Sequence, residues 1–426
     1  MRVTAAMWAG VATLFLACGA PSREAASPAP KKEAATRPET KAAGATADDD
    51  RDANASGITD ADAALDRGIE HNRGWRFDEA ARELEAALKL FEAASPRDEL
   101  KIIDTMSWLG RAYRGLGRWH DAEIVLRRRL AIAEDYQDDT ERSAALSDLA
   151  QVISESGDPR RAIPMFEEAI AIDERIGRGD DDTGKMARIH NLALALGDVG
   201  DERGAIKLLE RVLVADKQRD PVSVSTANTM HNLALNYRDA GELDKAEDLF
   251  ESAIRIITAK EGGDHPRLVP SLSGLAGTLK LAGKYDEAEL LYRQVLSITT
   301  KGRLDGRAIA LADLGDLEVQ VERFEEARVH LDEAIELLHR LYPDPKGHAE
   351  IVRTLIKRTA AHLGLEDVRA AERDTAAAIE MASEVYEGYD DEIARKVDWL
   401  GDIWDHAGHA KRAKSLRAQA DKLRRP

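Results

Sequence analysis

One short pattern recurs along most of the chain and limits what it can fold into. It is anchored by an alanine at nine positions, so that successive copies lie 39 to 44 residues apart: 80, 122, 162, 205, 246, 288, 327, 371 and 413. Thirteen residues before the anchor stands leucine in seven copies, and the next residue is glycine or alanine in eight. Five residues before it stands glycine in six copies. Such self-similarity indicates an array in which each copy is one structural unit.

The spacing of apolar residues within a copy predicts two helices. Leu233, Ala234 and Tyr237 share one helix face, and Gly241 can end that helix because glycine tolerates the left-handed cap conformation. A second apolar stripe with helical spacing follows at Ala246, Phe250, Ala253, Ile254 and Ile257. Neither stripe can be buried within one helix pair, so each copy needs its neighbours. No useful β-alternation occurs, and we predict an all-α fold.

The segment HNLALNYRDAGELDKAE at residues 231–247 resembles the tetratricopeptide repeat (TPR) family, in particular the longer repeats of kinesin light chains. The period near 42 fits that subtype better than the ordinary repeat of about 34 residues. The resemblance covers residues 59–426. It implies a right-handed α-solenoid of about nine helix-turn-helix repeats whose first helices line a concave groove. Arg67 and Arg358 replace the leucine in two copies, and we expect irregular stacking near the second of these, the eighth copy.

The N-terminus has the form of an export signal. An apolar run over residues 3–17 follows Arg2, and as a helix it would rise about 22 Å, short of the roughly 30 Å of a bilayer core. The run ends at Cys18, the only cysteine of the chain, and resembles the lipobox of bacterial lipoproteins, although Phe15 departs from the preferred leucine. The resemblance implies a signal peptide over 1–17, lipidation of Cys18 and anchoring in the cell envelope, with the outer membrane as the default. Plain secretion is the alternative.

Residues 18–58 are predicted to form a disordered tether. From residue 19 to residue 57 the chain has no Leu, Ile, Val, Phe, Tyr or Trp and is rich in Ala, Pro and charged residues. Such a segment cannot bury enough apolar area to offset the entropy of ordering. The expected domains are therefore the signal peptide, this linker and a repeat domain over 59–426.

Composition and motifs argue against several kinds of function. The chain carries 79 acidic and 61 basic residues, a net charge of −18, which disfavours nucleic-acid binding. A single cysteine excludes an intrachain disulfide framework and Cys-rich metal sites. We find no HExxH, GxSxG or dinucleotide-binding motif, and Asp180-Asp181-Asp182 lacks the spacing of a calcium loop. The sequence predicts no catalysis, no cofactor, no metal and no small-molecule substrate.

The family resemblance also implies where a ligand would bind. In TPR proteins the residue just before the conserved leucine points into the groove and is often asparagine, which can both donate to and accept from a peptide unit. Asn191 and Asn232 hold this position in adjacent copies, preceded by His190 and His231, whose alternative role is inter-helix packing. The other candidates at the same position are the apolar anchors Trp108 and Trp399 and the charged residues Asp148, Asp313 and Lys357.

We therefore predict a scaffold that binds an unknown protein or peptide in the groove while it is tethered to the membrane through its lipid. Because the groove acids cluster in the middle copies, a basic or neutral peptide is the expected guest. One alternative is an assembly protein that self-associates through its repeat ends. Another is a sensor that holds a small ligand inside the superhelix, although only 5% of the residues are aromatic, which disfavours an enclosed apolar pocket.

Overall fold

The computed structural model describes residues 49–299, 304–344, 347–386 and 388–424. The predicted signal peptide, Cys18 and the linker up to residue 48 lie outside these ranges. None of the described helices is both long and apolar enough to cross a membrane.

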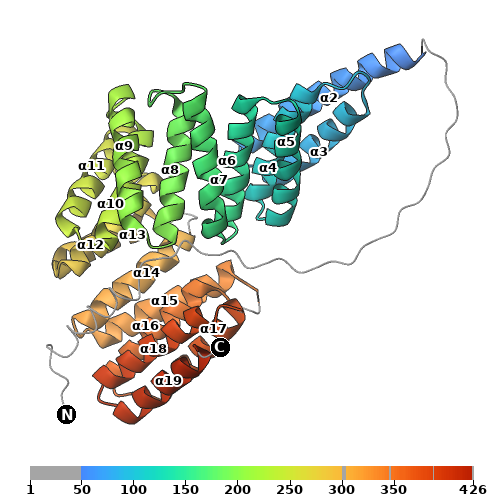
Figure 1. Ribbon diagram of the computed structural model, residues 1–426. Coiled ribbons are helices and arrows are strands. Elements are labelled where there is room, and N and C mark those ends of the chain that lie inside the picture. The colour runs from blue at the N-terminus through green and yellow to red at the C-terminus, as the bar shows by residue number, and fades with distance from the viewer. Residues whose placement is uncertain (1–48, 300–303, 345–346, 387, 425–426) are drawn as a thin grey trace, which may run out of the picture. The chain divides into compact units, whose positions relative to one another are not determined.

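Eighteen α-helices and one 3-10 turn make up the described chain, and these residues include no strand (Figure 1). The all-α fold of nine helix pairs is thereby confirmed. In chain order the pairs are α2 (Asp49–Arg73) with α3 (Phe77–Ala93), α4 (Glu99–Gly115) with α5 (Trp119–Asp135), α6 (Asp139–Glu155) with α7 (Pro159–Arg175), α8 (Thr183–Asp198) with α9 (Glu202–Arg219), α10 (Val224–Asp239) with α11 (Leu243–Glu261), α12 (Val269–Leu281) with α13 (Tyr285–Ile298), α14 (Leu304–Gln320) with α15 (Phe324–Leu341), α16 (Ala349–Gly364) with α17 (Val368–Val385), and α18 (Asp390–His406) with α19 (Ala410–Leu423). The turn η1 (Pro266–Leu268) precedes α12.

Helix α2 begins at Asp49, so the predicted linker over 18–58 overlaps it by ten residues. The predicted boundary rested on the absence of large apolar side chains. That absence argues against burial but not against a helix. Residues 49–58 contain no proline, and the helix that is buried from Ala61 onward extends through them although Gly57 and the Asp, Asn and Ser residues there are weak helix formers.

The chain divides into two compact units, which we describe separately. The first unit contains the described residues up to Ala215, and the second begins at Asp216, within α9. In each unit the first helices of successive pairs touch one another, α2 through α8 in the first unit and α10 through α18 in the second, while each second helix packs against flanking first helices. On each first helix, the residues 14, 11 and 7 or 8 positions before the anchor alanine lie on one side. We call this side the first-helix face.

The anchor alanines lie where the two helices of a pair approach most closely, and all nine are fully buried. Where the residue twelve positions before the anchor is glycine, it allows the first helix to come equally close to the second. A Cβ added at Gly110 would lie 2.7 Å from Leu126, and one added at Gly315 would lie 2.7 Å from Leu331. Such contacts are too short for real carbon atoms, so a larger residue at these positions would require Leu126 or Leu331 to move.

The turn inside each pair requires a left-handed backbone. The residue five positions before the anchor has positive φ in all nine copies, and six of these residues are glycine. The other three are Trp75 (φ 60°), Glu322 (φ 61°) and Glu366 (φ 59°). A residue with a Cβ pays about 1–2 kcal/mol for this conformation, so the turn is imposed by the packing of the helices on either side of it.

The two copies that lack the conserved leucine are regular helix pairs. Arg67 donates to Glu83 at 2.7 Å, and Arg358 donates to both carboxylate oxygens of Asp374 at 2.7 and 2.8 Å. Both acids lie three residues after the anchor, where most copies have an apolar residue. An ion pair thus replaces an apolar contact between the paired helices. The expectation of irregular stacking at the eighth copy is wrong, because α16 and α17 pack against each other and α16 contacts α14, α15 and α18 as its counterparts do.

We predict that Asp374→Leu lowers the free energy of unfolding by about 3 kcal/mol, because Arg358 is largely buried and loses its main partner. The double variant Arg358→Leu/Asp374→Leu should recover most of that loss, since it recreates the apolar pair of the other copies. Urea unfolding followed by far-UV circular dichroism measures both effects.

The matched control is Glu83→Leu in the first copy, where Arg67 keeps 53% of its side-chain surface exposed. We expect this change to cost less than about 1 kcal/mol. Equal losses at Glu83 and Asp374 would contradict the role assigned to burial.

Candidate functional site

The first-helix face of the second unit carries a row of ion pairs. Lys357 on α16 donates through Nζ to Asp313 Oδ1 on α14 at 2.8 Å. Lys280 on α12 donates to Asp316 on α14. Because the two aspartates lie one turn apart on α14, the two pairs join three successive first helices.

These pairs are only partly accessible to water. The side chain of Asp316 is 2% exposed, those of Lys280 and Lys357 are 11% and 13% exposed, and that of Asp313 is 28% exposed. Burial alone would raise the pKa of Asp313, but the charges of Lys357 and Lys280 outweigh it and hold that pKa below its usual value. Burial likewise opposes the charge of Lys357, but Asp313 and Asp316 raise its pKa above the ordinary one. Both partners are therefore ionised at neutral pH.

Helix α12 has glycine at two positions of the first-helix face, Gly274 and Gly277. A Cβ at Gly274 would lie 2.5 Å from Phe250, so no other residue fits there without a shift. A Cβ at Gly277 would lie 3.8 Å from Arg238 Nη1 and 3.9 Å from the hydroxyl oxygen of Tyr292, which therefore reaches to the level of the α12 backbone. Burial, followed by the charges of Asp313 and Asp316, raises the pKa of Tyr292, so its hydroxyl keeps its proton and can donate a hydrogen bond.

Of the predicted site residues in the second unit, Asp313 and Lys357 are brought together, as described above. His231 takes the packing role that was its alternative: its Nδ1 lies 3.3 Å from Ser271 Oγ, and its ring meets Phe250 edge-on at 5.5 Å between centroids. Asn232 is half-buried on α10, and its carbonyl oxygen accepts from the side chain of Asn236 at 2.8 Å.

Trp399 does not offer the apolar surface that was expected of it. Its side chain is only 3% exposed, because it lies within the core shared by α16, α17, α18 and α19. In the last copy, the large side chain at this position is therefore buried in the core. The expectation that it anchors a ligand is therefore corrected.

Asn191 and His190 are half-buried on α8, in the first unit. Asn191 and Asn232 thus belong to different units, and the predicted asparagine pair is not a single described site. Asp148 is bound within its own unit, since it accepts from Arg129 Nη1 at 2.5 Å and from Ser107 Oγ at 3.4 Å. Sequence reasoning missed buried Arg129, which lies on a second helix.

Trp108 lies at the junction of α2 and α4. Its carbonyl oxygen accepts from Asn72 Nδ2 at 2.8 Å. The guanidinium carbons of Arg111 and Arg73 lie 5.0 and 5.7 Å from the centre of its ring. This half-buried indole is therefore in contact with two cations on the first-helix face, and Arg73 was not among the predicted residues.

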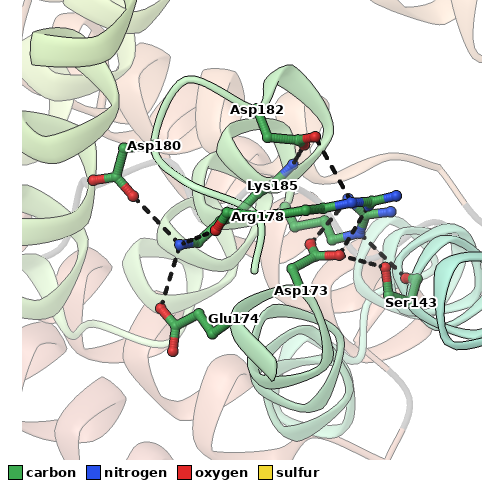
Figure 2. A network of polar contacts seen from close by, with 8 residues as sticks. Ser143, Asp173, Glu174, Arg178, Asp180, Asp182 and Lys185 are labelled. Atoms are coloured by element: carbon green, nitrogen blue, oxygen red, sulfur yellow. Dashed lines mark hydrogen bonds and ion pairs between the residues drawn. The ribbon is translucent and has the colours of Figure 1, made fainter. Parts of the chain in front are cut away.

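The acidic loop between α7 and α8 belongs to a structural network (Figure 2). Fully buried Asp173 accepts from Ser143 Oγ at 2.7 Å and from Arg178 Nη1 at 2.9 Å, and Arg188 Nη1 lies 3.1 Å from its second oxygen. Asp180 accepts from Arg211, which lowers the pKa of Asp180 to about 2, and Asp182 caps α8. Nearby cations and the helix end thus compensate these acids. No group of three or more ligands suited to a metal occurs in the described part of the chain.

His330 on α15 is tied to a buried acid. Its Nδ1 lies 2.7 Å from Glu318 Oε2 on α14, and the Glu318 side chain is 1% exposed. The hydrogen bond from Glu318 raises the pKa of His330 above its usual value, although burial opposes the shift. A raised pKa in the folded state stabilises the protein below the unfolded-state value of about 6.5, and this stabilisation disappears as the pH rises through the folded-state pKa.

His330 therefore contributes a decrease in the free energy of unfolding as the pH rises above about 6.5, and we expect His330→Gln to remove this contribution. Urea titrations at several pH values measure the slope. The control is His339→Gln, an exposed position on the same helix. A slope that is unchanged in His330→Gln would contradict this assignment.

Comparison with known proteins shows which repeat family parts of the chain resemble. Two sequence profiles described as tetratricopeptide repeat match residues 225–301 and residues 105–140. The matched segments, which contain α10 through α13 and most of α4 with α5, are similar to tetratricopeptide repeats. Comparison with curated proteins finds no match to the chain.

Several solved structures share the TPR fold. The apo quorum sensor NprR from B. thuringiensis has 15% identity and a TM-score of 0.61, over 86% of this chain and 99% of that one. A Rap protein complexed with competence and sporulation factor has 12% identity and a TM-score of 0.59, over 86% and 98%. Kinesin light chain repeats from Podosopora anserina have 25% identity and a TM-score of 0.42, over 47% and 97%.

Proposed function

We propose that this TPR protein is a non-catalytic scaffold that binds a protein or peptide along its first-helix faces. The observation that carries the proposal is the pair of ion pairs Lys357–Asp313 and Lys280–Asp316. Withdrawing charges from water is costly, and an apolar contact between first helices would be at least as stable. The pairs instead keep charge between successive first helices, where Asp313 is 28% exposed, Lys357 13% and Lys280 11%, so these three side chains remain partly accessible to a partner.

Two of the similar structures hold a bound factor, and one of these is named as a peptide. The Rap structure holds competence and sporulation factor, and an NprR structure with 15% identity and a TM-score of 0.54 holds its cognate peptide NprX. At Gly274 the space beside α12 is filled by Phe250, and at Gly277 it is bordered by Arg238 and the buried hydroxyl of Tyr292.

The exposed residues of the last helix favour partner binding over self-association through this end of the array. Along α19 most of them are polar or charged, including Lys411, Lys414, Arg417 and Lys422. A charged outer surface is typical of a terminal repeat, which must remain in contact with water.

A photoreactive p-benzoylphenylalanine scan tests the binding face. Placed at Leu235 or Asp402 on first helices, the probe should crosslink a discrete partner from cell-envelope extract, whereas at exposed Glu251 or Arg373 on second helices it should not. The variant Asp313→Asn/Lys357→Gln should lower the crosslinking yield about tenfold, since neutral groups bind charged or strongly polar partners less well.

The matched control removes an exposed lysine–glutamate pair at 2.9 Å, in Glu247→Gln/Lys284→Gln, and should leave the yield unchanged. Equal crosslinking from first and second helices, or equal yields from both double variants, would show that the first-helix face is not the binding surface.

We further propose that the scaffold is exported and anchored in the cell envelope through lipidated Cys18. The support is the apolar run that ends at the only cysteine of the chain. Metabolic labelling with an alkyne fatty acid should mark the protein, and Cys18→Ala should abolish the label and move the protein to the soluble fraction. Labelling that persists in Cys18→Ala would exclude this anchor.

A further inference from the structure

Trp75, in the turn between α2 and α3, is the most exposed large apolar residue in the described part of the chain. It is 81% exposed, compared with 71% for Leu100, the next in order. It also has a φ of 60° at the turn position where six copies have glycine. Exposure of an indole and a left-handed backbone both reduce stability, so the fold itself gives no reason for tryptophan at this position. Such a residue indicates a contact outside the chain.

The indole of Trp75 projects from an aromatic group on two neighbouring turns. Its ring meets that of half-buried Phe77 edge-on, with 5.9 Å between the centroids. A Cβ added at Gly115, at the end of α4, would lie 2.5 Å from Phe77, so Phe77 is packed against the next turn. Half-buried Trp119 begins α5 just after that turn. We call Trp75, Phe77 and Trp119 the aromatic edge.

Polar residues surround the projecting indole. Arg73 and Arg76 flank it along the chain, Asp78 and Glu79 follow in the first turn of α3, and all four are exposed. An aromatic anchor at a protein interface usually lies among other contacts that exclude water from it. A bilayer interface makes no such demand, because an indole can lie at the level of the headgroups, and neighbouring arginines can extend toward the phosphates. These surroundings therefore favour a phospholipid surface over a protein partner.

Building on the proposed lipidation of Cys18, we propose that the aromatic edge rests on the membrane that holds the lipid, with Trp75 inserted among the headgroups. Residues 19–48 connect Cys18 to α2 and, fully extended, span at most about 110 Å. Helix α2 rises about 37 Å from Asp49 to Arg73, so the turn that follows it is within reach of the bilayer. Because the lipid keeps the chain at the membrane, the contact is intramolecular, and one inserted side chain is sufficient.

The test uses the lipidated full chain in vesicles of phosphatidylethanolamine with a minor share of phosphatidylglycerol. His120→Cys, an exposed position next to Trp119, carries the polarity-sensitive dye NBD, since the sulfur of Cys18 is blocked by its lipid. The dye emission should lie further to the blue than in the same chain with Trp75→Gly, because the aromatic edge then leaves the bilayer. Brominated acyl chains should quench Trp75. Trp75→Tyr should abolish this quenching and keep the dye shift, since tyrosine also favours the interface.

Trp75→Gly should also raise the unfolding temperature, by about 1–3 °C, because glycine adopts the left-handed conformation without strain. Loss of the dye shift in this variant therefore cannot come from unfolding. One matched control is Glu366→Gly, which makes the same backbone change in the eighth copy, where φ is 59°. The other is Tyr389→Ser, which removes an aromatic residue of the second unit that is 62% exposed. Both should leave the dye shift intact.

The outcomes separate this contact from the anchor. If Cys18 carries a fatty acid and Trp75→Gly leaves the dye emission unchanged, the membrane contact is wrong and the anchor stands. If Cys18 carries none, the anchor is wrong, and the contact stands only when the chain added to vesicles from solution still shows the shift that depends on Trp75.

A third outcome distinguishes a protein partner. Here p-benzoylphenylalanine in place of Trp75 would crosslink a discrete envelope protein, and protein-free vesicles would produce no dye shift. That result would assign the aromatic edge to a protein interface and overturn the inference.

Discussion

The structure depends on the close approach of the two helices in each pair. A small residue on the first helix faces the middle of the second, and the anchor alanine faces back, so that the two backbones can pack without an intervening large side chain. Where the small residue is glycine, as at Gly110 and Gly315, even a methyl group would collide with a leucine of the partner helix. Glycine or alanine holds this position in all copies except the eighth, which has Thr359, and the left-handed turn residue recurs in all nine, even where it is Trp75, Glu322 or Glu366.

Once the pairs are formed by small and apolar residues, other positions are free to carry charge. Within a pair, Arg358 and Asp374 take the place of an apolar contact with little change of geometry, because each provides the counter-charge that the other needs. Between successive helix pairs, the ion pairs Lys357–Asp313 and Lys280–Asp316 likewise join neighbouring first helices through opposite charges. Ion pairs of this kind are no more stable than apolar contacts of similar volume, which is the reason we propose a recognition role for them.

The two units present different chemistry on that face. In the second, opposite charges are already paired with one another on α12, α14 and α16. In the first, Arg73 and Arg111 stack on Trp108. The net charge of −18 does not predict the local charge of either face, because it sums over the whole chain and does not show which opposite charges lie close together.

The sequence by itself determined the helix pairs, their number and their order, because small and apolar residues recur at spacings that only α-hairpins can bury. It also placed Asp313 and Lys357 at equivalent positions of adjacent copies. Only the tertiary structure decided which side chains meet. It paired those two residues, put Trp399 into the core and His231 against Phe250, and left Arg73 beside Trp108. The physical reason is that periodicity specifies the side of a helix on which a residue lies, whereas burial and pairing depend on side chains from neighbouring helices about forty residues away.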